Sequence, residues 1–190
     1  MGDEVAKQKS TSGSRPRFFG QFPVRLDNAM RLALPAAHRE VLETHYGHDG
    51  LRLILLPGVD CIRVMPPDVW EKVEQVLQQV SRRFNRNTDQ LLTYFYALMA
   101  ECELDAQNRI RLTPSLCRHI GLERDAVVTG ANNEMRIWRQ YTWEKFCQDM
   151  SHKFADELDA LDQALRDLEQ GRATQQNNQG VPGGNPISRE

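Results

Sequence analysis

One short passage occurs twice in this chain, and this duplication constrains the fold more than any other feature of the sequence. LDNAMRLALP runs from Leu26 to Pro35, and LDAQNRIRLTP runs from Leu104 to Pro114. Each begins with Leu-Asp, carries an arginine four residues after the aspartate, and alternates apolar residues up to a proline. A second pair follows in the same order, IRVMPPDVWEKV at 62–73 and MRIWRQYTWEKF at 135–146. Two ordered matches indicate a duplicated structural unit.

The residues around each copy predict the same order of elements. Alternation predicts a strand from Phe18 to Leu26, in which Pro23 requires an edge position or a bulge because proline cannot donate to the ladder. Pro35 is suited to open a helix that reaches about Tyr46, and a hairpin is predicted after it. The second half repeats strand, Asp-x-x-x-Arg loop, strand, short helix, two strands and helix. The predicted fold class is α+β.

Helical spacing predicts two helices between the halves and one after them. The helix that begins at Trp143 is expected to continue to about Glu169. Its apolar residues follow a seven-residue seam with spacings of 4, 3, 4 and 3, namely Phe154, Leu158, Leu161, Leu165 and Leu168. This seam predicts either packing onto the same domain or self-association.

Composition then divides the chain into segments. Polar ends that lack apolar residues cannot form a core, and we expect them to be disordered. The expected segments are a disordered arm at 1–16, a first repeat unit at 17–80, a linking helix at 81–98, a second repeat unit at 99–150, an amphipathic C-terminal helix at 151–170 and a disordered tail at 171–190.

Charge is distributed unevenly along the chain. The formal net charge is −2, but residues 156–190 contain seven acids and three arginines, which gives −4 and leaves +2 for the remainder. The stretch 15–39 contains five arginines and one acid, or +4. Local charge decides whether a phosphate backbone is attracted, because salt screens contributions beyond about 10 Å. The first half is therefore the better candidate for binding an anionic polymer.

Several classes of function are not expected. The four cysteines are widely spaced, which indicates reduced thiols and neither a metal site nor a disulfide framework. The sequence shows no secretory signal, no apolar run long enough for a membrane span, no nucleophile–base pair and no phosphate loop. We expect a cytoplasmic protein that is not an enzyme and has no cofactor.

The duplicated motif resembles that of the MraZ family, whose pattern in each half is approximately Asp-x-Lys-Gly-Arg, apolar, x, apolar, Pro. The resemblance covers about residues 18–150. The matching residues are Asp27, Arg31, Leu32, Leu34 and Pro35 in the first half, and Asp105, Arg109, Ile110, Leu112 and, one residue later, Pro114 in the second. The resemblance implies two tandem AbrB-like swapped-hairpin β-barrel units in a pseudo-twofold arrangement, with helices after each unit.

Both loops depart from the family pattern where it has Lys-Gly. The first half has Ala29-Met30 and the second has Gln107-Asn108. Glycine serves the left-handed backbone of a tight turn, and asparagine tolerates that backbone, whereas methionine adopts it at a cost of about 1 kcal/mol or more. The first loop is therefore expected to be either rearranged or strained, and each loop lacks one candidate phosphate contact.

The resemblance implies a DNA-binding transcriptional regulator that forms a ring-like homo-oligomer on repeated boxes of double-stranded DNA, associated with the nucleoid. The candidate DNA-binding residues are Arg15, Arg17, Arg25, Arg31, Arg109 and Arg111. Arginine suits this role because its planar fork binds phosphate or a guanine edge bidentately. Asp27 and Asp105 are expected to bond backbone amides of their own turns, or to pair with the loop arginines.

Other readings stay open. An oligomeric scaffold that has lost DNA recognition fits the missing Lys-Gly pairs and the slightly acidic net charge. An antitoxin-like regulator would bind DNA through the folded unit and a toxin through its tail, although such proteins carry one unit and this chain carries two.

Overall fold

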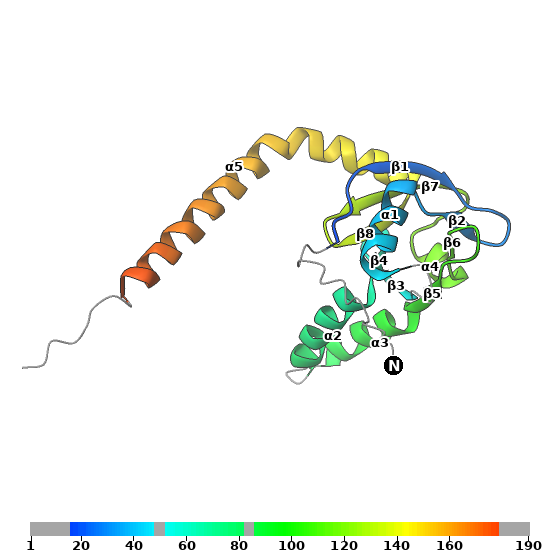
Figure 1. Cartoon of the computed structure of the whole chain (residues 1–190), viewed down its shortest axis with the longest axis horizontal. Coiled ribbons are helices and arrows are strands. Elements are labelled where there is room, and N and C mark those ends of the chain that lie inside the picture. Colours follow the sequence, from blue (N-terminus) through cyan, green and yellow to red (C-terminus); the bar gives the residue numbers. More distant parts are fainter. Residues whose placement is uncertain (1–15, 48–51, 82–85, 179–190) are drawn as a thin grey trace, which may run out of the picture. The chain divides into compact units, whose positions relative to one another are not determined.

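The computed structural model describes residues 16–47, 52–81 and 86–178 (Figure 1). Within these ranges the elements are β1 (Gln21–Arg25), β2 (Arg31–Ala33), α1 (Ala36–Tyr46), β3 (Arg52–Pro57), β4 (Cys61–Met65), α2 (Pro67–Ser81), α3 (Arg86–Leu98), β5 (Ala100–Glu103), β6 (Arg109–Arg111), α4 (Pro114–His119), β7 (Asp125–Ala131), β8 (Glu134–Arg139) and α5 (Gln140–Asn178). Strands and helices of both halves follow the predicted order, and the α+β class is confirmed.

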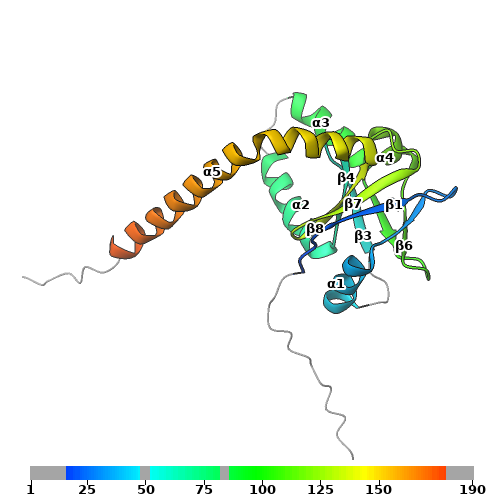
Figure 2. The same ribbon diagram turned by 90° about the horizontal axis from the view of Figure 1, so that it is seen from above.

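The named strands form two antiparallel sheets. The larger sheet has the order β1-β7-β8-β4-β3-β5, and β2 pairs with β6 in a separate two-stranded ribbon (Figure 2). β1 is therefore an edge strand, and Pro23 lies opposite Val127 in its register. The edge position predicted for Pro23 is confirmed.

Every strand of one half pairs with a strand of the other. β1 pairs with β7 and β5 with β3, while β2 pairs with β6 and β4 with β8. Exchanging the two halves converts the β1–β7 pair into the β5–β3 pair and leaves the other two pairs unchanged. The duplicated halves thus build one interleaved sheet system, and neither half closes its own sheet.

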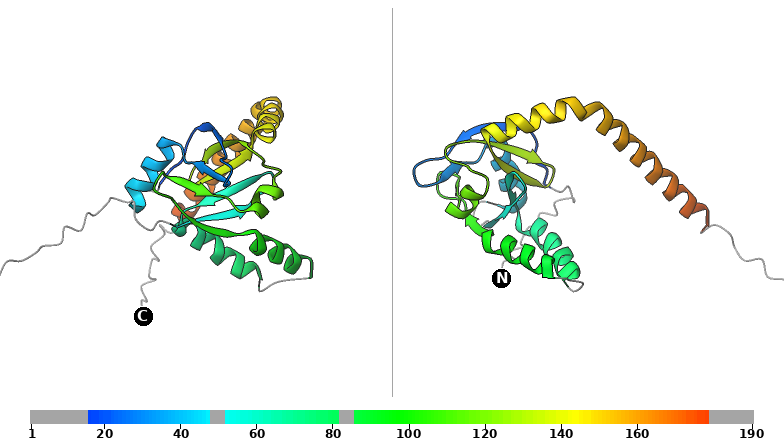
Figure 3. Two further views of the ribbon diagram at one scale, coloured as in Figure 1. Left: turned by 90° about the vertical axis from the view of Figure 1, so that its right-hand side faces the viewer. Right: turned by 180° about the vertical axis from the view of Figure 1, so that it is seen from behind.

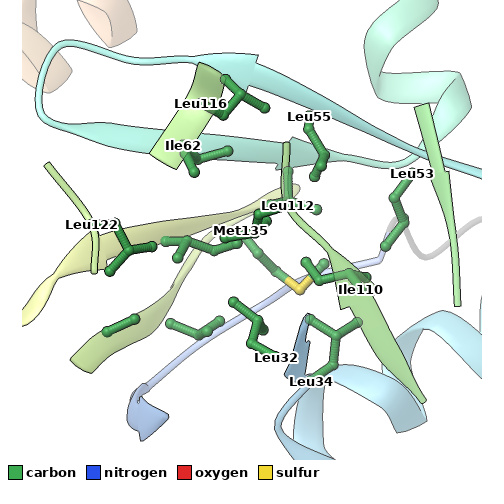
Figure 4. Close-up of a cluster of buried hydrophobic side chains, with 14 of the residues drawn as sticks. Leu32, Leu34, Leu53, Leu55, Ile62, Ile110, Leu112, Leu116, Leu122 and Met135 are labelled. Carbon is green, nitrogen blue, oxygen red and sulfur yellow. The ribbon is translucent and has the colours of Figure 1, made fainter. Parts of the chain in front are cut away.

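The main core is built equally from both halves. Leu32 and Leu34 follow one loop, Ile110 and Leu112 follow the other, and all four side chains are buried against the larger sheet (Figure 4). Alternation explains this, because every second residue of a strand points to the same face. The repeated apolar-x-apolar pattern therefore supplies matching halves of one core.

A second, smaller core lies on the opposite face of the β3–β4 hairpin. Its buried members are Ile54, Leu56, Met65, Val69 and Trp70, and Val73 and Leu77 of α2 and Phe95 of α3 pack against them. α2 and α3 run side by side here (Figures 1 and 3). One face of α2 is buried against the hairpin, and this explains why the apolar residues of α2 recur with helical spacing.

The two repeated tryptophans differ in burial. Trp70 is buried, as a helix-start residue in an apolar pattern predicts. Trp143 is half-buried, and its indole Nε1 donates to Gln21 Oε1 at 2.7 Å while its ring lies 5.4 Å from that of Trp138. Of the two repeated tryptophans, Trp70 thus belongs to a buried core and Trp143 lies partly at the surface.

The chain divides into two compact units after Trp143, and most of α5 belongs to the second. α5 extends to Asn178, beyond the expected end near Glu169. Gly171 costs a helix only about 1 kcal/mol, and the arginine, alanine and glutamines after it favour continuation. No helix within the described residues is both long enough and apolar enough to cross a membrane.

Candidate nucleic-acid interface

The first repeated loop is a tight turn organised by Asp27. Its Oδ1 accepts hydrogen bonds from the backbone amides of Ala29 and Arg31 at 2.8 and 2.9 Å, and its Oδ2 accepts from Arg31 Nε at 2.8 Å. The Met30 amide donates to the Asp27 carbonyl and the Asp27 amide to the Arg31 carbonyl. Both expected roles of Asp27, the amide bonds and the ion pair, are present together.

The second loop repeats this arrangement bond for bond. Asp105 Oδ1 accepts from the amides of Gln107 and Arg109, each at 2.9 Å, and Oδ2 accepts from Arg109 Nε at 2.8 Å. The left-handed backbone is also kept, with φ of 57° at Met30 and 56° at Asn108. The first loop therefore has the same backbone as the second and is strained at Met30. Of the two expectations from the sequence, a strained loop or a rearranged one, the first is correct.

The two loops lead into the β2–β6 ribbon, whose two faces differ. Leu32 lies opposite Ile110, and both are fully buried. Arg31 lies opposite Arg111, and Ala33 opposite Arg109, so these residues share the other face. Three of the six predicted arginines therefore meet on the outward face of one ribbon, which we call the arginine ribbon (Arg31, Arg109 and Arg111).

Carboxylates partly neutralise the arginine ribbon. Arg109 binds Asp105 through Nη2 at 2.7 Å and also reaches Asp27, with Nη1 3.5 Å from Oδ2. The backbone and side-chain hydrogen bonds from Arg31 hold the pKa of Asp27 below its usual range, and those from Arg109 do the same for Asp105. Both carboxylates are therefore ionised at neutral pH, and three arginines face two negative charges.

The three arginines are not equally engaged. Arg109 uses Nε and Nη2 for Asp105 and Gln107, and its side chain is 26% exposed. Among the described contacts the Arg31 side chain donates through Nε alone, and it is 37% exposed. Arg111 is exposed, and no ion pair involves it within the described part of the chain. Arg111 and Arg31 are therefore the more available cations.

Arg25 lies at the end of β1, two residues before Asp27, and outside the arginine ribbon. Its Nε donates to Asp125 Oδ1 at 2.8 Å, and both side chains are largely exposed. At the other edge of the sheet, Arg52 of β3 pairs with Glu103 of β5 at 2.9 Å. The two pairs lie at equivalent places in the repeat, but their charges are reversed. The edge strand β1 carries the arginine of its pair, and the edge strand β5 carries the acid.

The other arginines that could contact DNA make fewer described contacts. Arg17 is exposed beside the fully buried Phe18, and Arg15 lies outside the described residues. Arg124 was not predicted as a candidate, because its neighbours Glu123 and Asp125 make that stretch look acidic. It is exposed, and its carbonyl accepts the amide of Leu26 at 2.9 Å, which brings it beside the end of β1.

Two other repeated arginines are structural, as their recurrence in both copies of the hairpin suggests. Arg63 and Arg136 lie opposite each other where β4 pairs with β8, and both donate to Glu134. The Glu134 side chain is only 5% exposed, with Arg63 Nη2 at 2.6 Å and Arg136 Nε at 2.9 Å from it. A buried carboxylate between two arginines joins the halves and is unsuited to DNA contact.

Comparison with known proteins places this chain in a family. It is 32% identical over 133 residues to the transcriptional regulator MraZ of Alkaliphilus oremlandii, a match that covers 70% of this chain and 87% of that protein. The chain belongs to the MraZ family. The MraZ of Moorella thermoacetica is 30% identical over 154 residues, covering 80% of this chain and 99% of that protein.

Two further matches agree. The MraZ of Syntrophobacter fumaroxidans is 33% identical over 130 residues, or 68% of this chain and 84% of that protein. A family model described as "MraZ protein, putative antitoxin-like" matches residues 95–164. The resemblance predicted from the duplicated motif is confirmed, and this MraZ chain keeps the paired Asp-Arg turns although both loops lack Lys-Gly.

Proposed function

We propose that this protein is a DNA-binding transcriptional regulator that binds repeated boxes of double-stranded DNA as a ring-like homo-oligomer, in the cytoplasm and on the nucleoid. The observation that carries the proposal is the arginine ribbon, which places Arg31, Arg109 and Arg111 on one outward face. The names of the related MraZ proteins, which are transcriptional regulators, support it.

The type of element is one that DNA can accommodate. A two-stranded β-ribbon fits the B-DNA major groove, and arginine bonds the guanine edge or a phosphate with two parallel hydrogen bonds. Arg111 and Arg31 have side-chain donors that no described residue occupies, so we assign them the direct contacts. Arg109 is assigned mainly to holding the loop, while Arg25 and Arg17 extend the cationic surface along β1.

Assembly is part of the proposal. Three arginines against two carboxylates give one ribbon little net charge, so one copy offers few phosphate contacts. Several ribbons on one DNA would multiply those contacts and raise the effective concentration of each. The interleaved pairing of the two halves, 17–80 and 99–150, supports the assignment of two tandem AbrB-like swapped-hairpin units related by a pseudo-twofold axis.

Titration of pooled labelled genomic fragments at two salt concentrations tests this function. Affinity is expected to fall steeply as salt rises, and Arg31→Ala is expected to weaken binding severely because it removes both a contact and the loop ion pair. Arg111→Ala is the cleaner variant, and it should lower the salt slope by about one. Arg52→Ala is the matched control, since Arg52 is also an exposed strand arginine and lies at the acidic edge.

One observation favours a second candidate. The ion pairs from Asp27 and Asp105 reduce the charge that the ribbon offers, which fits an oligomeric scaffold that has lost DNA recognition. A protein that runs as a large oligomer and shifts no genomic fragment at low salt would establish the scaffold. Equal losses from Arg111→Ala and Arg52→Ala would reject the ribbon as the DNA face.

A further inference from the structure

The second compact unit carries an apolar stripe along α5. Phe154, Leu158, Leu161 and Leu165 are 61%, 45%, 55% and 49% exposed. Their spacings of four, three and four residues keep them on one side of the helix, in the seven-residue pattern of a helix seam. This stripe, which we call the α5 seam, is the longest continuous series of exposed apolar residues on any described helix.

A partner is needed to explain the seam. Scattered exposed apolar residues are normal on a protein surface, whereas a contiguous stripe marks an interaction site. Within the described residues of the second compact unit α5 is the single element, so the unit itself supplies nothing that covers these four side chains.

Charge identifies the kind of partner. Between Phe154 and Leu168 the sequence contains five acids and a single base, Arg166; the acids are Asp156, Glu157, Asp159, Asp162 and Asp167. Two copies of this segment packed seam to seam would place acids beside acids, which destabilises a helix pair and directs partner choice. A second copy is therefore the disfavoured occupant.

We propose that the α5 seam docks a basic amphipathic helix of another protein, one whose apolar seam is flanked by lysine or arginine. Leucines and the phenylalanine would supply the buried contact, and the surrounding acids would select the charge of the partner and speed its approach. The same acids repel phosphate, so this surface is distinct in chemistry from the arginine ribbon. The inference goes beyond the proposed function and does not depend on it.

The test uses the full-length protein and two synthetic probes. One is a labelled amphipathic peptide of about three heptads with leucine at the seam and lysine beside it; the other has glutamate in place of every lysine. Leu158→Asp combined with Leu161→Asp disrupts the seam. Ala160→Asp combined with Gln163→Asp adds the same charge on other faces of the helix and is the matched control.

The basic peptide is expected to bind the native protein at least about tenfold more tightly than the acidic peptide, and less tightly as salt rises. The seam variant should lose at least tenfold despite its two added acids, whereas the control variant should bind as the native protein does. Failure of both peptides to bind, or equal binding of both, would overturn the proposal. A fall in solution mass in the seam variant would instead show that a second copy covers the seam.

Discussion

Arg109 Nη1 lies 3.5 Å from Asp27 Oδ2, so an arginine of the second repeat contacts the aspartate that organises the turn of the first. Asp27 therefore faces two guanidinium groups, whereas the described contacts of Asp105 include only Arg109. The two loops are alike in backbone and in the hydrogen bonds that each aspartate accepts from its own turn, but the described contact between the loops is made by Arg109 to Asp27. We therefore expect the two equivalent aspartates to contribute unequally to the stability of the fold.

Asp27→Asn is expected to lower the urea midpoint of unfolding more than Asp105→Asn does. In both variants the amide oxygen can still accept the backbone hydrogen bonds of the turn, so the change removes mainly the charge. That charge holds two arginines at Asp27 and one at Asp105. Equal midpoints for the two variants would show that the contact between the loops has no energetic effect.

Glu134→Gln tests the junction of the halves. The carboxylate is 5% exposed and receives both Arg63 and Arg136, so its neutralisation leaves two partly buried cations without their counter-charge. We expect a loss of about 2 kcal/mol in the free energy of unfolding, less than for a fully buried pair because both arginines are partly exposed. Urea denaturation measures it.

Glu101→Gln is the matched control for that variant. Glu101 lies 3.6 Å from Arg52, and its side chain is 62% exposed, so its loss should cost less than about 0.5 kcal/mol. A Glu134→Gln protein as stable as the control would mean that the buried carboxylate is not what couples β4 to β8.

The Glu134 cluster also shows what the sequence does not reveal. Arg63 and Arg136 recur in the duplicated hairpin and were assigned to the fold for that reason, but their shared partner has no counterpart. The position equivalent to Glu134 in the first half is Cys61, so the repeat gives no sign of the acid. Because Glu134 occurs in one half alone, the repeat could not be used to predict that it binds both arginines.

The strand pairings between the two halves were equally hidden, although the strands themselves and the β3–β4 hairpin were predicted. Alternation shows which face of a strand is buried and not which strand lies beside it. Proximity along the chain favours pairing within each half, yet β1 pairs with β7 and β2 with β6. In contrast, Asp27 and Asp105 act within five residues of sequence, and their turns were predicted correctly because the chemistry is local.

Met30→Gly is expected to raise the free energy of unfolding by about 0.5 kcal/mol. Met30 has a φ of 57°, which costs a residue with a side chain about 1 kcal/mol, and glycine removes that cost. Glycine also raises the conformational entropy of the unfolded chain, and this offsets part of the stabilisation. Asn108→Gly should change stability less, since asparagine tolerates the same backbone. Urea midpoints compare them, and a stabilisation of Asn108→Gly equal to that of Met30→Gly would contradict the strain at Met30.

His38 should make stability depend on pH. It is 1% exposed, and its Nε2 lies 2.9 Å from the Phe19 carbonyl oxygen, while Nδ1 has no hydrogen-bond partner among the described residues. The rings of Phe18 and Phe22 meet it edge to face at 5.5 and 5.1 Å. The Phe19 carbonyl oxygen can only accept, so Nε2 carries the proton of the neutral ring, and burial lowers the pKa of His38 from its usual 6.5.

The sign follows from proton binding. Near and below pH 6.5 the unfolded chain binds a proton on His38 more readily than the folded chain does, so acidification favours unfolding, by at most about 1.4 kcal/mol per pH unit. Urea unfolding measured from pH 7.5 to pH 5.5 should show this loss, and His38→Gln should flatten it because glutamine does not titrate. His119→Gln is the control, since both ring nitrogens of His119 have partners, in Gly58 and Tyr94. A slope that survives in His38→Gln would assign the pH dependence to another group.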